Sequence, residues 1–379
     1  MFTGVLPHDH GIHVYNRDFS GLTREDTFLG EIPEHTALGA SANVYASEAF
    51  GFDGMFDRFR SVSPDRRFPR GMDVERWGQQ CDADGIRRYL AFARDALAHD
   101  NPLASLGNGV LVEVADRFAD APFPTPFDDG ARLVEKQSKE LVSGESDPFF
   151  LFTNFMDAHG PFHHVRGYDS SLHDIPVSWE LVDWINSNTD RETTIVVTAD
   201  HGENLGLPAD GELLAHKGVL TEGLMHVPLL VLNAPSDLTD IDKNRYVSHL
   251  SLGKLLAGLA RNEIPDITAD RIPGERIGSN MADSATEDER AEWDRMIRVV
   301  YDQEIKYEWD SEGDQARYRL SAEKPNWQEK IDEDLPRETL DGGFFDIPLH
   351  EYKEAARHED DRREVDEATR NRLADLGYR

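Results

Sequence analysis

The chain has 379 residues, enough for a full α/β core and a smaller second unit. Its 73 acidic residues outnumber its 40 basic ones and give a formal net charge of −33. Such an excess of carboxylates destabilises a compact protein by self-repulsion unless counterions screen it, so we expect a halophilic protein from an acidic proteome. Nucleic acid is excluded as a partner because no basic stripe is present to neutralise phosphates. A single cysteine excludes a disulfide framework.

No stretch of sequence approaches the apolar length that crosses a bilayer, so no membrane span is expected. Residues 1–30 also lack a basic start followed by an apolar stretch, the pattern of an export signal. These observations predict a cytoplasmic protein, provided that the coding sequence does not begin upstream of Met1. The sequence leaves the oligomeric state open.

The first half of the chain predicts a mixture of strands and helices. Residues 35–41 predict a short strand, and residues 50–59 predict part of the core. Apolar residues at helical spacing within 75–101 predict a surface helix packed on a sheet. The alternating prolines of 121–127 predict a loop, since proline lacks the backbone N–H that a strand pairing or a helix interior requires. Residues 128–141 predict a further helix.

Two near-continuous apolar runs predict interior strands of a parallel sheet. The first, residues 148–156, ends just before His159, and the second, residues 193–198, ends just before Asp200 and His201. Open α/β sheets carry their working groups beyond the carboxyl ends of such strands, which places all three side chains where chemistry occurs. The plain alternatives are an Asp-His-Gly turn that merely ends a strand and an ordinary loop histidine.

The last quarter of the chain predicts a different kind of unit. Residues 297–301, 305–309 and 318–320 alternate apolar and polar side chains and are separated by short polar turns, a pattern that predicts an antiparallel sheet. Residues 351–379 predict a charged helix. We therefore expect an α/β core over residues 1–285 and a C-terminal α+β subdomain over residues 286–379.

Several short motifs occur in a characteristic order along the chain. They are Phe2-Thr3-Gly4 with Pro7 and His10-Gly11, Gly51-Phe52-Asp53 with Phe56-Asp57, Met156 to Phe162, Asp200 to Glu203, His216-Lys217-Gly218 with Glu222, and Val227 to Val231. In this order they resemble the sulfatase family of the alkaline phosphatase superfamily. The resemblance implies a three-layer α/β core with a mostly parallel sheet, together with a small C-terminal antiparallel sheet and helix.

The resemblance also implies roles for four residues. Asp200 and His201 would hold a divalent metal ion, Ca²⁺ first, with Mg²⁺ and Mn²⁺ as alternatives. His159 would assist the leaving oxygen, and the ammonium of Lys217 would contact the sulfate group. Without the resemblance, an exposed lysine is solvated surface. His216 either shares the role of Lys217 or simply flanks it.

The chain departs from the family pattern in two places. In the family, the Phe-Thr-Gly turn follows a nucleophile in a C/S/T-x-P-x-R motif, and an earlier strand ends in paired metal-binding aspartates. This sequence opens at Met1-Phe2-Thr3-Gly4, and Cys81 lacks the Pro and Arg of the motif. The nucleophile and the first metal-binding strand are therefore expected upstream, and the chain as given is expected to be inactive. Residues 41–47 also lack the Lys-x-His that touches sulfate in many sulfatases.

The function implied by the resemblance is metal-dependent hydrolysis of a small-molecule or carbohydrate sulfate ester. One alternative is a phosphomonoester, phosphodiester or phosphonate hydrolase of the same superfamily, because the two ester types share geometry and differ in charge. Another alternative is a non-catalytic truncated homologue that keeps the fold as a binding module.

Overall fold

The structure is a computed structural model, and it describes most of the chain. The described residues are 1–62, 68, 71–72, 74, 77, 85–118, 130–156, 171–189, 191–214, 216, 218–234, 245–278, 286, 293–333 and 343–357. The chain divides into two compact units. The inserted unit comprises Glu34–Arg191 and Val365–Gly377, and the outer unit comprises Met1–Pro33, Glu192–Glu364 and Tyr378–Arg379. The predicted boundary between residues 285 and 286 stays a prediction.

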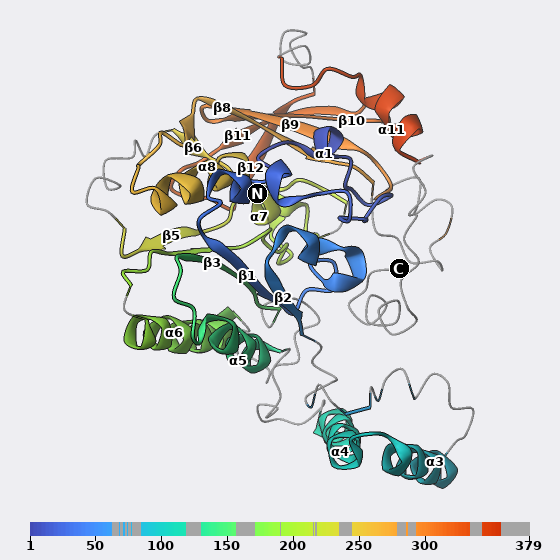
Figure 1. Ribbon diagram of the computed structural model, residues 1–379. Helices are drawn as coiled ribbons and strands as arrows, with labels where there is room; N and C mark the ends of the chain where they lie inside the picture. The colour runs from blue at the N-terminus through green and yellow to red at the C-terminus, as the bar shows by residue number, and fades with distance from the viewer. Residues whose placement is uncertain are drawn as a thin grey trace. The chain divides into compact units, whose positions relative to one another are not determined.

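The inserted unit is built on a parallel sheet with strand order β2-β1-β3 (Figure 1). Its strands are β1 (Thr36–Ser41), β2 (Arg58–Ser61) and β3 (Phe149–Asn154). The central strand is β1, in which Leu38 pairs with Arg58 on one side and with Leu151 on the other. The strands predicted at 35–41 and 148–156 are confirmed. Together with the antiparallel sheet described below, they confirm the mixed α/β fold class.

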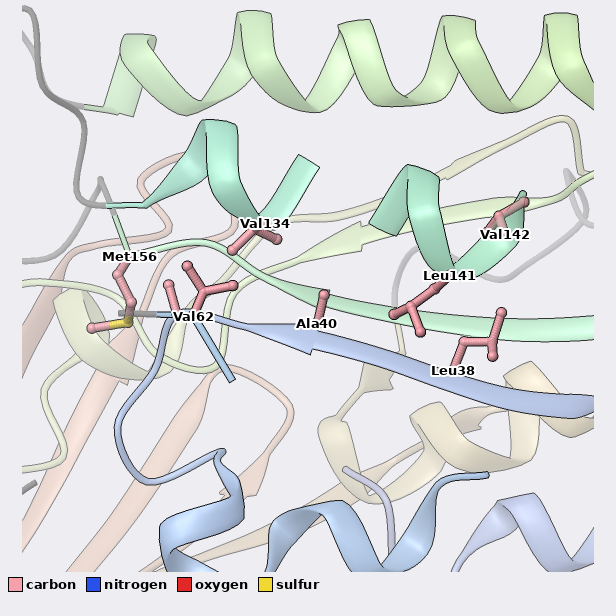
Figure 2. Packing of buried hydrophobic residues seen from close by; sticks show 8 residues of the cluster. Leu38, Ala40, Val62, Val134, Leu141, Val142 and Met156 are labelled. Atoms are coloured by element: carbon pink, nitrogen blue, oxygen red, sulfur yellow. The ribbon is translucent and has the colours of Figure 1, made fainter. Parts of the chain in front are cut away.

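Helix α5 (Ala131–Val142) covers this sheet, and α6 (Ser171–Asn188) packs on α5. Val134 and Leu141, seven residues and so two turns apart, lie on one face of α5. Figure 2 shows both side chains directed at the strand that carries Leu38 and Ala40, and all four are buried. Fully burying one such side chain stabilises a fold by roughly 1.5–3 kcal/mol. This layer confirms the helix predicted at 128–141.

An aromatic cluster packs against Gly39 in β1. An added Cβ at Gly39 would lie 2.4 Å from the ring of Phe59, so only glycine fits beneath that ring. Phe52, Phe56, Phe59 and Phe152 form the cluster, with ring centroids 5.1–6.1 Å apart. Residues 50–59 are thus part of the core, as predicted.

Helices α3 (Ile86–Ala98) and α4 (Pro102–Phe118) pair with one another. The prediction of a helix within 75–101 is confirmed for α3, but its prediction as a helix packed on the sheet is wrong. Helix α3 packs on α4 because glycines in α4 leave space for aromatic rings. A Cβ at Gly109 would lie 2.1 Å from the ring of Phe92 in α3. The loop predicted at 121–127 lies outside the described residues.

The outer unit is built on an antiparallel sheet with strand order β12-β11-β10-β9-β8. Its strands are β8 (Arg271–Arg276), β9 (Ile297–Asp302), β10 (Ile305–Asp310), β11 (Gln315–Leu320) and β12 (Gln328–Asp332). The antiparallel sheet predicted from 297–320 is confirmed. Helix α11 (Leu349–Arg357) confirms the start of the predicted terminal helix, and residues 358–379 lie outside the described part.

A buried charge cluster ties the beginning of the chain to this sheet. His8, in α1 (Pro7–His10), contacts Glu275 through its backbone N–H at 3.1 Å and through Nδ1 at 2.8 Å. On its other side Glu275 accepts a hydrogen bond of 2.7 Å from Nε of Arg298. The side chains of Glu275 and Arg298 are almost fully buried. Because buried charges are stable only when paired, these three residues depend on one another.

Strands β4 (Ile195–Thr198) and β5 (Leu229–Leu232) form a separate pair in the outer unit. The pairing is antiparallel, with Ile195 opposite Leu232, and Val197 is 41% exposed. The prediction that residues 193–198 form an interior strand of a parallel sheet is therefore wrong. An apolar, β-branched run predicts extended backbone, but it does not fix the direction of the neighbouring strand.

The remaining elements of both units are short, apart from α8. They are the 3-10 turns η1 (Arg24–Asp26), η2 (Phe28–Glu31), η3 (Glu48–Phe50), η4 (Phe52–Met55) and η5 (Pro208–Asp210), the helices α7 (Glu222–Met225) and α8 (His249–Ala260), and the strands β6 (Tyr246–Val247) and β7 (Thr268–Ala269). Among the described helices, none has the length and apolar character needed to span a membrane.

Candidate metal centre

The candidate site lies on the segment that follows β4. After Thr198, the chain leaves the strand and reaches Asp200, His201 and Gly202. The N–H of Gly202 donates a hydrogen bond of 2.8 Å to the carbonyl of Leu224. A Cβ at Gly202 would lie only 2.1 Å from the carbonyl oxygen of Gly223, so the close approach requires glycine. Gly202 thus fixes its neighbour His201 against helix α7.

His201 has a defined ring orientation. Its Nδ1 lies 2.7 Å from the carbonyl oxygen of Gly202. A carbonyl oxygen only accepts hydrogen bonds, so Nδ1 carries the proton and Nε2 keeps its lone pair. Histidines that bind metals typically donate the other ring N–H to a carbonyl or carboxylate in this way. The geometry of His201 therefore suits a metal ligand.

Three side chains converge here: His201, Glu203 and His216 each offer a donor atom, and these atoms all lie within 4.8 Å of one another. The rings of His201 and His216 have centroids 4.9 Å apart, and Nδ1 of His216 lies 3.3 Å from Oε2 of Glu203. All three side chains are half-buried. We call them the His-Glu-His cluster.

Asp200 lies outside the His-Glu-His cluster and is exposed. Its Oδ1 accepts a hydrogen bond of 3.0 Å from the backbone N–H of His201. It also acts on His249 at the start of α8: burial lowers the pKa of His249, and the negative charge of Asp200 opposes that shift. His249 therefore favours its neutral form and is a nearby residue that the sequence motifs did not indicate.

A buried polar network involves residues that follow the His-Glu-His cluster along the chain. Lys306, on β10, is fully buried, and its Nζ lies 3.1 Å from Oε1 of Glu222 and 2.7 Å from the carbonyl oxygen of Leu220, to which it donates. Burial raises the pKa of Tyr301 well above its ordinary value, so its hydroxyl stays protonated and donates to Glu222 at 2.8 Å. The network anchors Leu220 and Glu222 to β9 and β10.

Asp210 is a second buried acid near α7. It is 2% exposed, and among the described residues neither oxygen meets a partner in good hydrogen-bond geometry. Burial raises the pKa of its carboxyl, while the backbone of Gly223 and the charge of Lys306 partly oppose the shift. A buried carboxylate with so little compensation is costly to the fold.

Comparison with known proteins gives structural matches only. No family model and no curated protein matches the chain. A putative sulfatase from Bacteroides thetaiotaomicron has a similar structure over 98% of this chain and 84% of its own, with a TM-score of 0.50 and 13% identity. The chain therefore has the same fold as this sulfatase.

Two further solved structures are similar to this chain at slightly lower scores. A 2-O GAG sulfatase matches 98% of this chain and 84% of its own, with a TM-score of 0.49 and 12% identity. The phosphonate monoester hydrolase of Agrobacterium radiobacter matches 86% of this chain and 79% of its own, with a TM-score of 0.48 and 12% identity.

Two of the four predicted site residues lie in the described part of the chain, and two lie outside it. Asp200 and His201 follow directly on β4, as predicted, and His201 belongs to the His-Glu-His cluster. His159 and Lys217 lie outside the described residues, so their predicted roles stay predictions. The resemblance to the family gives Glu203 no role. Its place two residues after His201 in the same motif is the signal that could have indicated it.

Proposed function

We propose that the chain is a metal-dependent hydrolase of sulfate esters, acting on a small-molecule or carbohydrate substrate. The observation that carries the proposal is His201, which follows β4 in a chain of sulfatase fold and presents Nε2 as a ligand. Asp200, next to it, is the second proposed ligand, and a carboxylate with an imidazole fits a divalent cation. We propose Ca²⁺, Mg²⁺ or Mn²⁺ from the sequence motifs.

The bound cation would draw negative charge off the nonbridging oxygens of the ester. The other proposed roles belong to the chain's own side chains. His159 would donate a proton or a hydrogen bond to the leaving oxygen. Lys217 would add a compact positive charge next to it.

The test uses the protein expressed together with the coding sequence upstream of Met1, and offers an aryl sulfate and an aryl phosphate side by side, with each cation added in turn. Cation-dependent release from the sulfate supports the proposal, and His159→Ala and Lys217→Ala are then expected to lower the rate by about 10² to 10⁴ while cation binding persists. If the aryl phosphate is hydrolysed faster than the aryl sulfate, the proposed substrate would change from a sulfate ester to a phosphate ester. Cation binding without any turnover would favour the non-catalytic alternative, and a chain that binds no cation would overturn the proposal.

A further inference from the structure

The His-Glu-His cluster has the composition of a nitrogen-rich metal site. Ca²⁺ and Mg²⁺ prefer oxygen ligands alone, roughly 6 to 8 of them for Ca²⁺. Two imidazoles with one carboxylate instead match the three-ligand set of catalytic zinc sites, in which the fourth position stays open. Affinity for such donors increases from Mn²⁺ towards Zn²⁺. The donor set of His201, Glu203 and His216 therefore favours a different ion from the one that the sequence motifs indicated.

The spacing of the donors fits such an ion after small rotations. With metal–ligand distances of about 2.0–2.2 Å, two ligands of a tetrahedral zinc ion lie about 3.3 Å apart. Nδ1 of His216 and Oε2 of Glu203 lie 3.3 Å apart. The full set lies within 4.8 Å, so the remaining donor pairs need to close by about 1.5 Å or less. Both side chains keep some exposure, 27% for His216 and 19% for Glu203, which leaves room for that rotation.

The backbone favours the same arrangement. The Gly202 carbonyl holds Nδ1–H of His201, and this leaves Nε2 as the donor. Gly202 itself is fixed by the carbonyls of Gly223 and Leu224, so His201 is held in place before any ion binds. A ligand oriented in advance loses less entropy on binding.

We infer that Glu203 and His216 join His201 as ligands of a Zn²⁺-type cation, with Mn²⁺ bound more weakly and Ca²⁺ more weakly still. The inference deepens the proposed function, because the cation is the one proposed to act on the ester. It adds Glu203 and His216 to the site and changes the expected metal.

The experiment measures binding rather than turnover. Zn²⁺, Mn²⁺ and Ca²⁺ are titrated calorimetrically into the full chain and into Glu203→Gln and His216→Ala. Each variant is expected to weaken Zn²⁺ binding more than about 10-fold, since losing even an outer partner of a ligand costs 10–100-fold. His226→Ala and Glu212→Gln are matched controls, because both residues are exposed, lie on the same segment and stand outside the cluster. They are expected to leave the affinity unchanged.

A spectroscopic readout separates ligation from a structural effect. Mn²⁺ bound to the chain is expected to show ¹⁴N modulation in electron spin-echo spectra, reduced in His216→Ala and retained in His226→Ala. Melting curves without metal show whether each variant is folded. Wild-type Zn²⁺ affinity in folded Glu203→Gln and His216→Ala would overturn the inference and leave the contact between Glu203 and His216 as an ordinary hydrogen bond.

The outcomes for the inference and for the proposed function are distinguishable. Ca²⁺-dependent sulfate release that needs Asp200 but not Glu203 or His216 would keep the function and remove the inference. Zn²⁺ binding that needs Glu203 and His216, without hydrolysis of either ester, would keep the inference and remove the function. A chain that binds none of the three cations would remove both.

Discussion

Replacing Lys306 by methionine should destabilise the outer unit strongly. The ammonium is fully buried, lies 3.1 Å from the Glu222 carboxylate and donates to the Leu220 carbonyl at 2.7 Å. At an effective dielectric constant of about 20, opposite charges at this distance attract by roughly 5 kcal/mol. Lys306→Met leaves the Glu222 charge buried and unpaired, and breaking a buried pair in this way costs about 3–5 kcal/mol. We therefore expect the free energy of unfolding to fall by about that amount.

Urea unfolding at a fixed, high KCl concentration, followed by circular dichroism, gives this free energy from the midpoint and slope. Lys330→Met is the matched control, because Lys330 is 48% exposed and pairs with Glu333 on the surface, where a pair is worth about 0–1 kcal/mol. The double variant Lys306→Met with Glu222→Gln removes both charges and should recover part of the loss. A loss below about 1 kcal/mol in Lys306→Met, or no recovery in the double variant, would refute the reasoning, because the unpaired charge is the source of the cost.

Three further predictions concern the fold. The raised pKa of Asp210 means that the folded state binds the carboxyl proton more tightly than the unfolded state does. The ionised form therefore destabilises the fold at neutral pH. Asp210→Asn should raise the melting temperature at pH 7, and this gain should shrink as the pH falls towards the ordinary pKa of 3.8. An unchanged or lowered melting temperature at pH 7 would count against this. Gly39→Ala should destabilise the inserted unit by about 1–3 kcal/mol in the same urea assay, since its Cβ would meet the Phe59 ring. The charge of −33 predicts a melting temperature that increases from roughly 0.1 M to 3 M KCl, because the screening length falls from about 10 Å to below about 3 Å; a flat response would contradict halophilic adaptation.

Much of the fold follows from local patterns. The strands β1 and β3, the helix α5 and the strands β9 to β11 all carry apolar runs, alternation or helical spacing, so the sequence predicts them. Helix α4 was not predicted because Gly107 and Gly109 each disfavour a helix by about 1 kcal/mol. The structure supplies the reason for these glycines: the rings of Phe68 and Phe92 pack where their side chains would be. Such a long-range contact is absent from any local window of sequence.

The candidate site was predictable only in part. Asp200 and His201 follow a strand and fit a family motif, so the sequence indicates them. The contact between Glu203 and His216 joins residues thirteen positions apart, on the two sides of an isolated antiparallel bridge between Leu205 and Leu214, and no local sequence pattern predicted that bridge. The direction of β4 relative to β5 was likewise decided by tertiary pairing, because the same apolar residues satisfy either direction.

The contact between His8 and Glu275 spans 267 positions and has a consequence for synthesis of the protein. Ribosomes add roughly 5–20 residues per second, so His8 waits on the order of 10 to 50 seconds before Glu275 has been made, and longer for Arg298. The larger part of the inserted unit, Glu34–Arg191, is synthesised in that interval, and domains generally fold as units in the order of their synthesis. The segment Met1–Pro33 has no partner from the rest of the outer unit until residues 192 onward have been made, among them α8, which contacts η2. Nascent chains of this protein should therefore pass through a stage in which the larger part of the inserted unit is complete while Met1–Pro33 is unprotected, and chaperones and proteases would bind the chain at that stage.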